Sequence, residues 1–153
     1  LLFKSDFEMT TRLDVSAAPG HLIRRAQQIA VAIFAGQLAT ADITPVQFAI
    51  LSAVHDTPGI DQITLAKRVA FDPATSGSVI GRLEAKGWIK RDADAQDRRR
   101  KLLWVTHEGS QALVGMQTAV AQVQAQILSP LSPQEQTQFV GLLTRLVQGH
   151  EST

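Results

Sequence analysis

The chain has 153 residues, which is long enough for one domain with a hydrophobic core. Its hydrophobic content of 44% and charged content of 19% are typical of a soluble globular protein and exclude a disordered chain. It contains no cysteine, which excludes a disulfide framework and a thiolate nucleophile.

The N-terminal residues show no regular apolar period, so we expect residues 1–18 to form a flexible segment. Met9 is a candidate natural start, in which case residues 1–8 would not be native. No basic-then-apolar secretory signal is present, and the apolar run at residues 29–36 falls far short of the roughly 18 residues of a membrane span. These features predict a cytoplasmic protein.

The first half of the chain is predicted to be helical. Apolar residues at helical spacing predict a long first helix from His21 to about Ala41. A second helix is expected to begin with Thr44 as its N-cap and Pro45 at its first position, and to end before Pro58.

Two further helices follow at close spacing. Asp61 is a candidate N-cap for a short third helix, and Asp72 opens a fourth helix that Gly87 terminates. A short helix, a brief turn and a second helix are typical of a helix-turn-helix.

Residues 88–91 and 101–105 are predicted to be two strands joined by a polar hairpin, or wing. A helix followed by a cationic hairpin suits duplex DNA, with the helix in the major groove and the tip on phosphates or in the minor groove. The alternative is a charged loop that is merely solvated. This region carries eight of the chain's 15 lysines and arginines, namely Arg82, Lys86, Lys90, Arg91, Arg98, Arg99, Arg100 and Lys101.

The last third of the chain is predicted to form two amphipathic helices. Thr106 is expected to cap the first, which ends at Ser129-Pro130, and Ser132 with Glu135 forms a capping box for the second. The predicted fold class is mainly α with a small β-wing. A winged helix needs only the middle of this chain, so the apolar stripes of the terminal helices require a partner, and a second copy is the simplest one.

Five short pieces, in this order, carry a resemblance to the MarR family of winged-helix regulators: residues 43–48 (ITPVQF), 65–66, 82–91 (RLEAKGWIKR), 97–100 (DRRR) and 105–109 (VTHEG). The resemblance implies one domain at residues 19–153. Within it, residues 44–106 would be the winged helix-turn-helix, and residues 19–42 and 107–149 would be dimerisation helices. It also implies a homodimer on pseudopalindromic DNA that responds to a small-molecule or oxidation signal.

The recognition helix departs from a pattern found in many members of the family. The positions of an early Thr-Arg pair hold Gly77 and Ser78 here, and residues 73–78 look more like members that control aromatic-compound catabolism. We expect shorter hydroxyl contacts in place of arginine readout of guanine, and an ion pair in which Asp97 fixes Arg99. The predicted DNA-binding residues are Thr75, Ser76, Ser78, Arg82, Lys86, Asp97, Arg98, Arg99 and Arg100.

A ligand site is predicted at the start of the first helix. An arginine beside a histidine can bind a carboxylate, because the guanidinium donates two parallel hydrogen bonds. The resemblance makes the ligand a small aromatic or heteroaromatic acid (benzoate-, hydroxycinnamate- or nicotinate-like). The alternative is that an arginine pairs with an acid across a dimer. The candidate residues are His21, Arg24, Arg25, Phe48, His55 and Phe71.

Other functions have little support in the sequence. The four histidines lack metal-ligand spacing, and neither a nucleophile elbow nor a Gly-rich phosphate loop is present, so we expect no metal, cofactor or enzymatic activity. The sequence predicts a homodimeric DNA-binding repressor that a small acid releases from its operator. A ligand-independent DNA-binding protein and a protein-interaction module are the alternatives.

Overall fold

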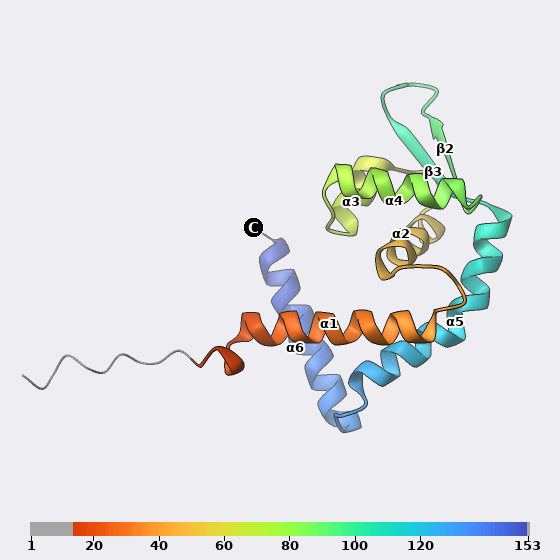
Figure 1. The fold of residues 1–153 in the computed structure, drawn as a ribbon. Coiled ribbons are helices and arrows are strands. Elements are labelled where there is room, and N and C mark those ends of the chain that lie inside the picture. The colour runs from red at the N-terminus through yellow and green to blue at the C-terminus, as the bar shows by residue number, and fades with distance from the viewer. Residues whose placement is uncertain (1–13, 153) are drawn as a thin grey trace, which may run out of the picture.

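A computed structural model describes residues 14–152; it is mainly helical, and its β2–β3 hairpin projects from the molecule beside α4 (Figure 1). The elements in chain order are η1 (Val15–Ala17), α1 (Pro19–Gln37), α2 (Pro45–Asp56), β1 (Ile60–Asp61), α3 (Gln62–Arg68), α4 (Pro73–Ala85), β2 (Ile89–Ala93), β3 (Lys101–Val105), α5 (His107–Leu128) and α6 (Pro133–Glu151). The prediction of a mainly α fold with a β-wing is confirmed.

Side-chain caps start five of the helices where the sequence predicts them. Thr44, Asp61, Asp72, Thr106 and Ser132 each accept a hydrogen bond from the backbone N–H three residues later. Such a bond satisfies a donor that the first helical turn leaves free, so the start is encoded locally. At the other end of α4, Gly87 adopts a φ of +78°, which glycine tolerates best.

The first helix differs from its prediction at both ends. It begins at Pro19 and ends at Gln37, not at about Ala41. The apolar period continues through the buried Leu38, but the chain turns there and Asp42 takes a φ of +48°. Of the N-terminal segment expected to be flexible, residues 15–17 form a single 3-10 turn capped by Asp14, and residues 1–13 lie outside the described range.

The sheet has three antiparallel strands in the order β1-β3-β2. The predicted hairpin is present, with Ile89 opposite Val105 and Ala93 opposite Lys101. The sequence did not reveal β1, because two residues are too few for an alternating pattern. Ile60 pairs with Leu103, and this pairing attaches the start of α3 to the wing.

One core joins α2, α3, α4 and the sheet. Leu51, Leu65, Ile80, Leu83 and Leu103 are fully buried there. Phe34 of α1 extends the core toward α2, where its ring lies 6.1 Å from that of Phe48. Helix α4 and the wing strands therefore pack on the same hydrophobic core.

The C-terminal helix contrasts with this core. In α6, all of whose residues are described, no side chain is buried. Its exposed large apolar residues lie at helical spacing and form one stripe (Phe139, Val140, Leu142, Leu143, Leu146 and Val147, between 41% and 61% exposed). Among residues 14–152, no helix combines the length and apolar character needed to cross a bilayer.

Candidate nucleic-acid interface

The recognition helix α4 presents a surface of small polar side chains. Thr75 and Ser78 are exposed on it, and Arg82 is exposed one turn further on. Thr75 also donates its hydroxyl to the Asp72 carboxylate at 2.6 Å, and this bond is the largest cause of the lowered pKa of Asp72. The hydroxyl oxygen still has accepting capacity, so Thr75 and Ser78 can bond to base edges or phosphates.

Ser76 corrects one predicted contact. Its side chain is fully buried in the core, and its Oγ has no hydrogen-bond partner among the described residues. The helical period places position 76 on the same face as Ile80 and Leu83, so the side chain points away from solvent. Ser76 therefore cannot contact DNA from this position, although the residue type suggested that it would.

Replacement of Ser76 by alanine is expected to raise the free energy of unfolding by about 1 kcal/mol, because it removes an unpaired buried hydroxyl and improves helix propensity. Urea denaturation measures this change. DNA affinity should remain within about twofold of the wild-type value. Ser78→Ala is the matched variant at an exposed position, and there we expect weaker DNA binding at unchanged stability. A loss of DNA affinity in the Ser76 variant would instead support the predicted contact between Ser76 and DNA.

The structure divides the eight clustered cations into paired and unpaired groups. Lys90 lies 3.1 Å from Asp92, and Arg91 contacts Glu84 at 3.3 Å while it donates to Gln62. Within residues 14–152, Arg82, Arg98 and Lys101 form no ion pair. Fewer than eight of these cations are therefore available to neutralise DNA phosphates.

Lys86 is engaged at the far end of α4. Its ammonium donates to the Asp42 carbonyl, lies 3.6 Å from the Asp42 carboxylate and sits 4.7 Å from the centre of the Trp88 ring. These contacts hold α4 to the loop after α1. They leave the side chain only 24% exposed, so the structure gives Lys86 a structural role in place of the predicted DNA contact.

The wing tip carries two exposed arginines, Arg98 and Arg99. The predicted ion pair between Asp97 and Arg99 is present only as one long contact, 3.9 Å from Asp97 Oδ1 to Arg99 Nε, and the side chain of Arg99 is 96% exposed. Asp97 instead accepts the backbone N–H of Arg99 at 3.1 Å and so stabilises the turn. Arg98 and Arg99 are consequently free to follow a phosphate backbone or enter a narrow groove.

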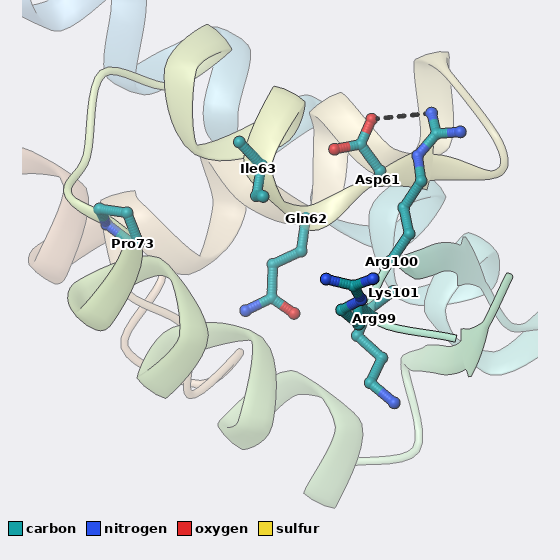
Figure 2. A pocket seen from close by; sticks show the side chains of 7 residues that line it. All are labelled: Asp61, Gln62, Ile63, Pro73, Arg99, Arg100 and Lys101. Atoms are coloured by element: carbon teal, nitrogen blue, oxygen red, sulfur yellow. Dashed lines mark hydrogen bonds and ion pairs between the residues drawn. The ribbon is translucent and has the colours of Figure 1, made fainter. Parts of the chain in front are cut away.

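A groove of about 190 Å³ separates the wing from α3 and the start of α4 (Figure 2). Its lining residues are Asp61, Gln62, Ile63, Pro73, Arg99, Arg100 and Lys101. Figure 2 shows Arg100 paired with Asp61 on one side of the groove and the Gln62 side chain extending along it near Arg99. The groove thus combines cationic and apolar walls beside the recognition helix.

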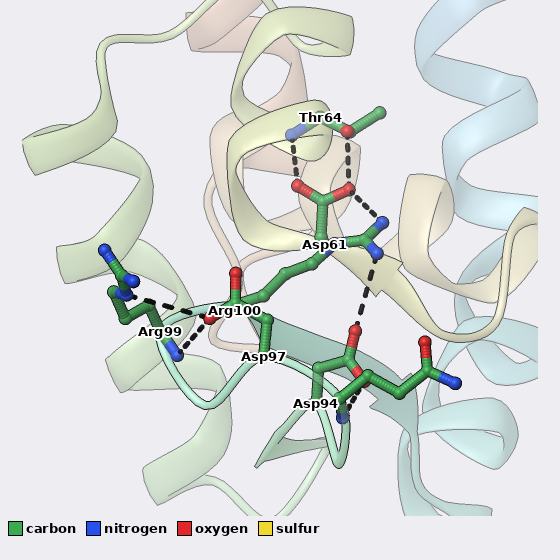
Figure 3. A network of polar contacts seen from close by, with 7 residues as sticks. Asp61, Thr64, Asp94, Asp97, Arg99 and Arg100 are labelled. Atoms are coloured by element: carbon green, nitrogen blue, oxygen red, sulfur yellow. Dashed lines mark hydrogen bonds and ion pairs between the residues drawn. The ribbon is translucent and has the colours of Figure 1, made fainter.

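Arg100 is held by two carboxylates from different elements (Figure 3). Its guanidinium lies 3.2 Å from Asp61 Oδ2 and 3.4 Å from Asp94 Oδ2. The pKa of Asp61 falls to about 2, first because the Thr64 hydroxyl and backbone N–H donate to its carboxylate, and further because of Arg100. Asp61 is therefore a permanent anion near neutral pH, and it ties the wing to the first turn of α3.

The predicted ligand residues form separate groups among the described contacts. Arg24 lies 3.3 Å from the His21 ring nitrogen, while Arg25 turns to donate to Gln28. At the end of α2, His55 Nδ1 lies 3.8 Å from Asp56 Oδ1. Phe48 packs against Phe34, and Phe71 is half-buried in the connection between α3 and α4. His21 and Arg24 alone of this set share a direct polar contact in the described chain.

Sequence reasoning missed the acidic and amide partners of this surface. Asp61 was identified as a helix cap, but its second role as a partner of Arg100 was not, and Asp94 and Gln62 were not singled out. These three residues lie close to the wing arginines only in the folded chain, so no local sequence pattern identifies them. No group of three or more His, Cys, Asp or Glu side chains in residues 14–152 is arranged to hold a metal ion.

Comparison with known proteins identifies the same segment. The family model described as "MarR family" matches residues 43–101. The chain is 34% identical over 106 residues to the transcriptional regulator HosA of Escherichia coli O157:H7, covering 69% of this chain and 78% of HosA. It is 30% identical over 142 residues to the transcriptional repressor NicR of Pseudomonas putida, covering 93% of this chain and 90% of NicR.

Two solved structures share both fold and sequence with the chain. The PcaV regulator of Streptomyces coelicolor, in complex with its natural ligand, superposes with a TM-score of 0.80 at 34% identity, over 89% of this chain and 96% of PcaV. Bordetella bronchiseptica BpsR, whose DNA binding is regulated by 6-hydroxynicotinic acid, superposes with a TM-score of 0.82 at 32% identity. The match covers 86% of this chain and 94% of BpsR. Together with the winged-helix geometry, these matches show that the chain belongs to the MarR family of transcriptional regulators.

Proposed function

We propose that this regulator is a homodimeric repressor that binds a pseudopalindromic DNA operator and leaves it when a small aromatic or heteroaromatic carboxylate binds. The observation that carries the DNA half is the exposed surface of α4 and the wing. There Thr75, Ser78 and Arg82 lie on the helix, and Arg98 and Arg99 lie at the tip without a close acidic partner. Hydroxyl groups and free guanidinium groups are the usual contacts to base edges and phosphates.

The dimer half rests on the terminal helices. The apolar stripe of α6 finds no cover within the described chain, and α1 exposes Leu22, Ile23 and Ile29 as well. Contiguous apolar residues exposed along one helix face are typical of a protein–protein interface. We therefore assign residues 44–106 to the DNA-binding lobe, and residues 19–42 and 107–149 to a dimer interface that sets the spacing of the two recognition helices.

The ligand half rests on similarity and on the first turns of α1. BpsR responds to 6-hydroxynicotinic acid, and this chain is 32% identical to it. His21 and Arg24 lie side by side on α1, where a guanidinium and an imidazole can bind one carboxylate. Arg25, Phe48, His55 and Phe71 remain proposed contributors, and a partner subunit would have to bring some of them together.

The test is a DNA-binding titration. A fluorescent operator is first selected from random duplexes by the purified protein, and its affinity is then measured with 6-hydroxynicotinate, nicotinate, benzoate and 4-hydroxycinnamate. We expect at least one acid to weaken binding by about tenfold to 100-fold, and a 100-fold effect requires about 2.7 kcal/mol of differential affinity between the two states. The uncharged amide, nicotinamide, is the control for the carboxylate and should have no effect.

Two results would count against the proposal in different ways. Unchanged operator affinity with all four acids would leave a ligand-independent repressor. No operator selected at any salt concentration would remove DNA binding itself. An Arg24→Gln variant that binds the operator normally but no longer responds to the acid would place the carboxylate at α1.

A further inference from the structure

Arg100 differs from its neighbours on the wing in both its partners and its exposure. Its two terminal nitrogens face the carboxylates of Asp61 and Asp94, whose side chains are only 13% and 18% exposed. Its backbone carbonyl accepts the N–H of Asp94 at 2.8 Å, and its own N–H donates to the Asp97 carbonyl at 2.9 Å. The Arg100 side chain is itself 53% exposed, but its terminal nitrogens and its main chain all have partners within the protein.

These partners leave Arg100 with little capacity for DNA. Two carboxylates already balance its charge, so the local sum of these three groups is negative. Arg99, by contrast, is 96% exposed, and Arg98 forms no ion pair in the described chain. Adjacent arginines of one sequence run therefore have opposite functions.

We propose that Arg100 and Asp61 are positioning residues that fasten the wing to the start of α3 and so set the width of the groove in which Arg99 and Lys101 meet the DNA backbone. Figures 2 and 3 show the geometry, in which the Arg100 side chain extends from the residue before β3 to Asp61 along one side of the groove. The effect on DNA rests on the proposed operator binding, whereas the effect on the wing does not.

Asp61 permits a clean separation of its two roles. It caps α3 through Thr64, accepting the backbone N–H at 3.0 Å and the hydroxyl at 2.6 Å. Asparagine is as good an N-cap as aspartate, so Asp61→Asn keeps the cap and removes the charge opposite Arg100. Asp72 is a matched control, because it caps α4 through Thr75 with nearly the same distances and has no ion pair in the described chain.

Operator affinity then distinguishes positioning from contact by its sign. If Arg100 were a phosphate contact, Asp61→Asn would free its guanidinium and remove a negative charge, and binding would tighten. If Arg100 positions the wing, Asp61→Asn should weaken binding by about three- to tenfold, Arg100→Gln should weaken it similarly, and the double variant should be no weaker than either. Asp72→Asn should not weaken binding.

A second measurement needs no DNA. Because the chain has no native cysteine, spin labels attach only at Lys67→Cys on α3 and Ala95→Cys on the wing. Doubly labelled protein diluted about tenfold with unlabelled protein reports distances within one chain. We expect one narrow distance distribution for the parent and for Asp72→Asn, and a broadened or shifted one for Asp61→Asn and Arg100→Gln.

Each outcome decides a separate question. Unchanged distances in the two variants, or tighter operator binding by Asp61→Asn, would overturn the positioning role. If the parent protein binds no operator but the distances broaden as described, the proposed function fails and the wing clamp stands. Thermal unfolding of the variants should match that of the parent closely enough that wing displacement is not a symptom of general unfolding.

Discussion

Replacing Gly109 by alanine is expected to lower the free energy of unfolding by about 2–4 kcal/mol, one of the largest effects of any single methyl group in this chain. Gly109 is buried in the first turn of α5. A Cβ built there would lie 2.3 Å from the Trp88 carbonyl oxygen and 2.8 Å from Val105 Cγ1. The backbone oxygen of Trp88 cannot turn aside as a side chain can, so the start of α5 must move away from the segment at Trp88.

The close approach at Gly109 follows from a cluster of hydrogen bonds around the end of α4. Thr106 donates its backbone N–H to the Trp88 carbonyl at 3.0 Å and its hydroxyl to the Gly87 carbonyl at 2.5 Å. Gly109 in turn donates to the Thr106 hydroxyl oxygen at 3.0 Å. This junction joins the recognition helix to α5, so the alanine variant should lose operator affinity as well as stability.

Chemical denaturation of Gly109→Ala and Gly81→Ala provides the comparison. Gly81 lies inside α4, outside the helices assigned to the dimer, and a Cβ there would meet nothing within 4 Å. Alanine at position 81 should therefore be neutral or stabilise by up to about 1 kcal/mol through helix propensity. Equal stability of Gly109→Ala and the parent would show that the junction can open without cost.

The second large effect concerns α6. Leu146→Glu should convert the dimer to monomers and weaken operator binding by at least about 100-fold, because each half-site would then be bound independently. Leu146 is 48% exposed within the apolar stripe, and a carboxylate there would be buried without a partner in any interface that covers the stripe. Light scattering gives the mass, and operator titration gives the affinity.

Gln148→Glu is the control for this experiment. It introduces the same charge two residues away, on the opposite and polar face of α6, and should leave both mass and affinity unchanged. A monomeric parent protein, or a dimer that tolerates glutamate at position 146, would exclude α6 from the interface.

Local sequence signals are sufficient to predict where most helices and strands begin and what kind of fold they form. The caps at Thr44, Asp72 and Ser132 act within one helical turn, so these residues predict the start of a helix whatever the rest of the chain does. The wing followed from a hairpin pattern that is also local. The family followed from short motifs in a fixed order.

Which of the predicted site residues are accessible depends instead on long-range contacts in the folded chain. Lys86 is paired with Asp42, and Arg100 with Asp61, across 44 and 39 positions of the chain, and no local pattern reveals such partners. Burial likewise removed Ser76 from a row of hydroxyl residues that look equivalent in sequence. Caps and turns depend on residues within a few positions of each other, so they can be predicted from the sequence. Ion pairing and burial depend on which distant segments the core brings together, so they cannot.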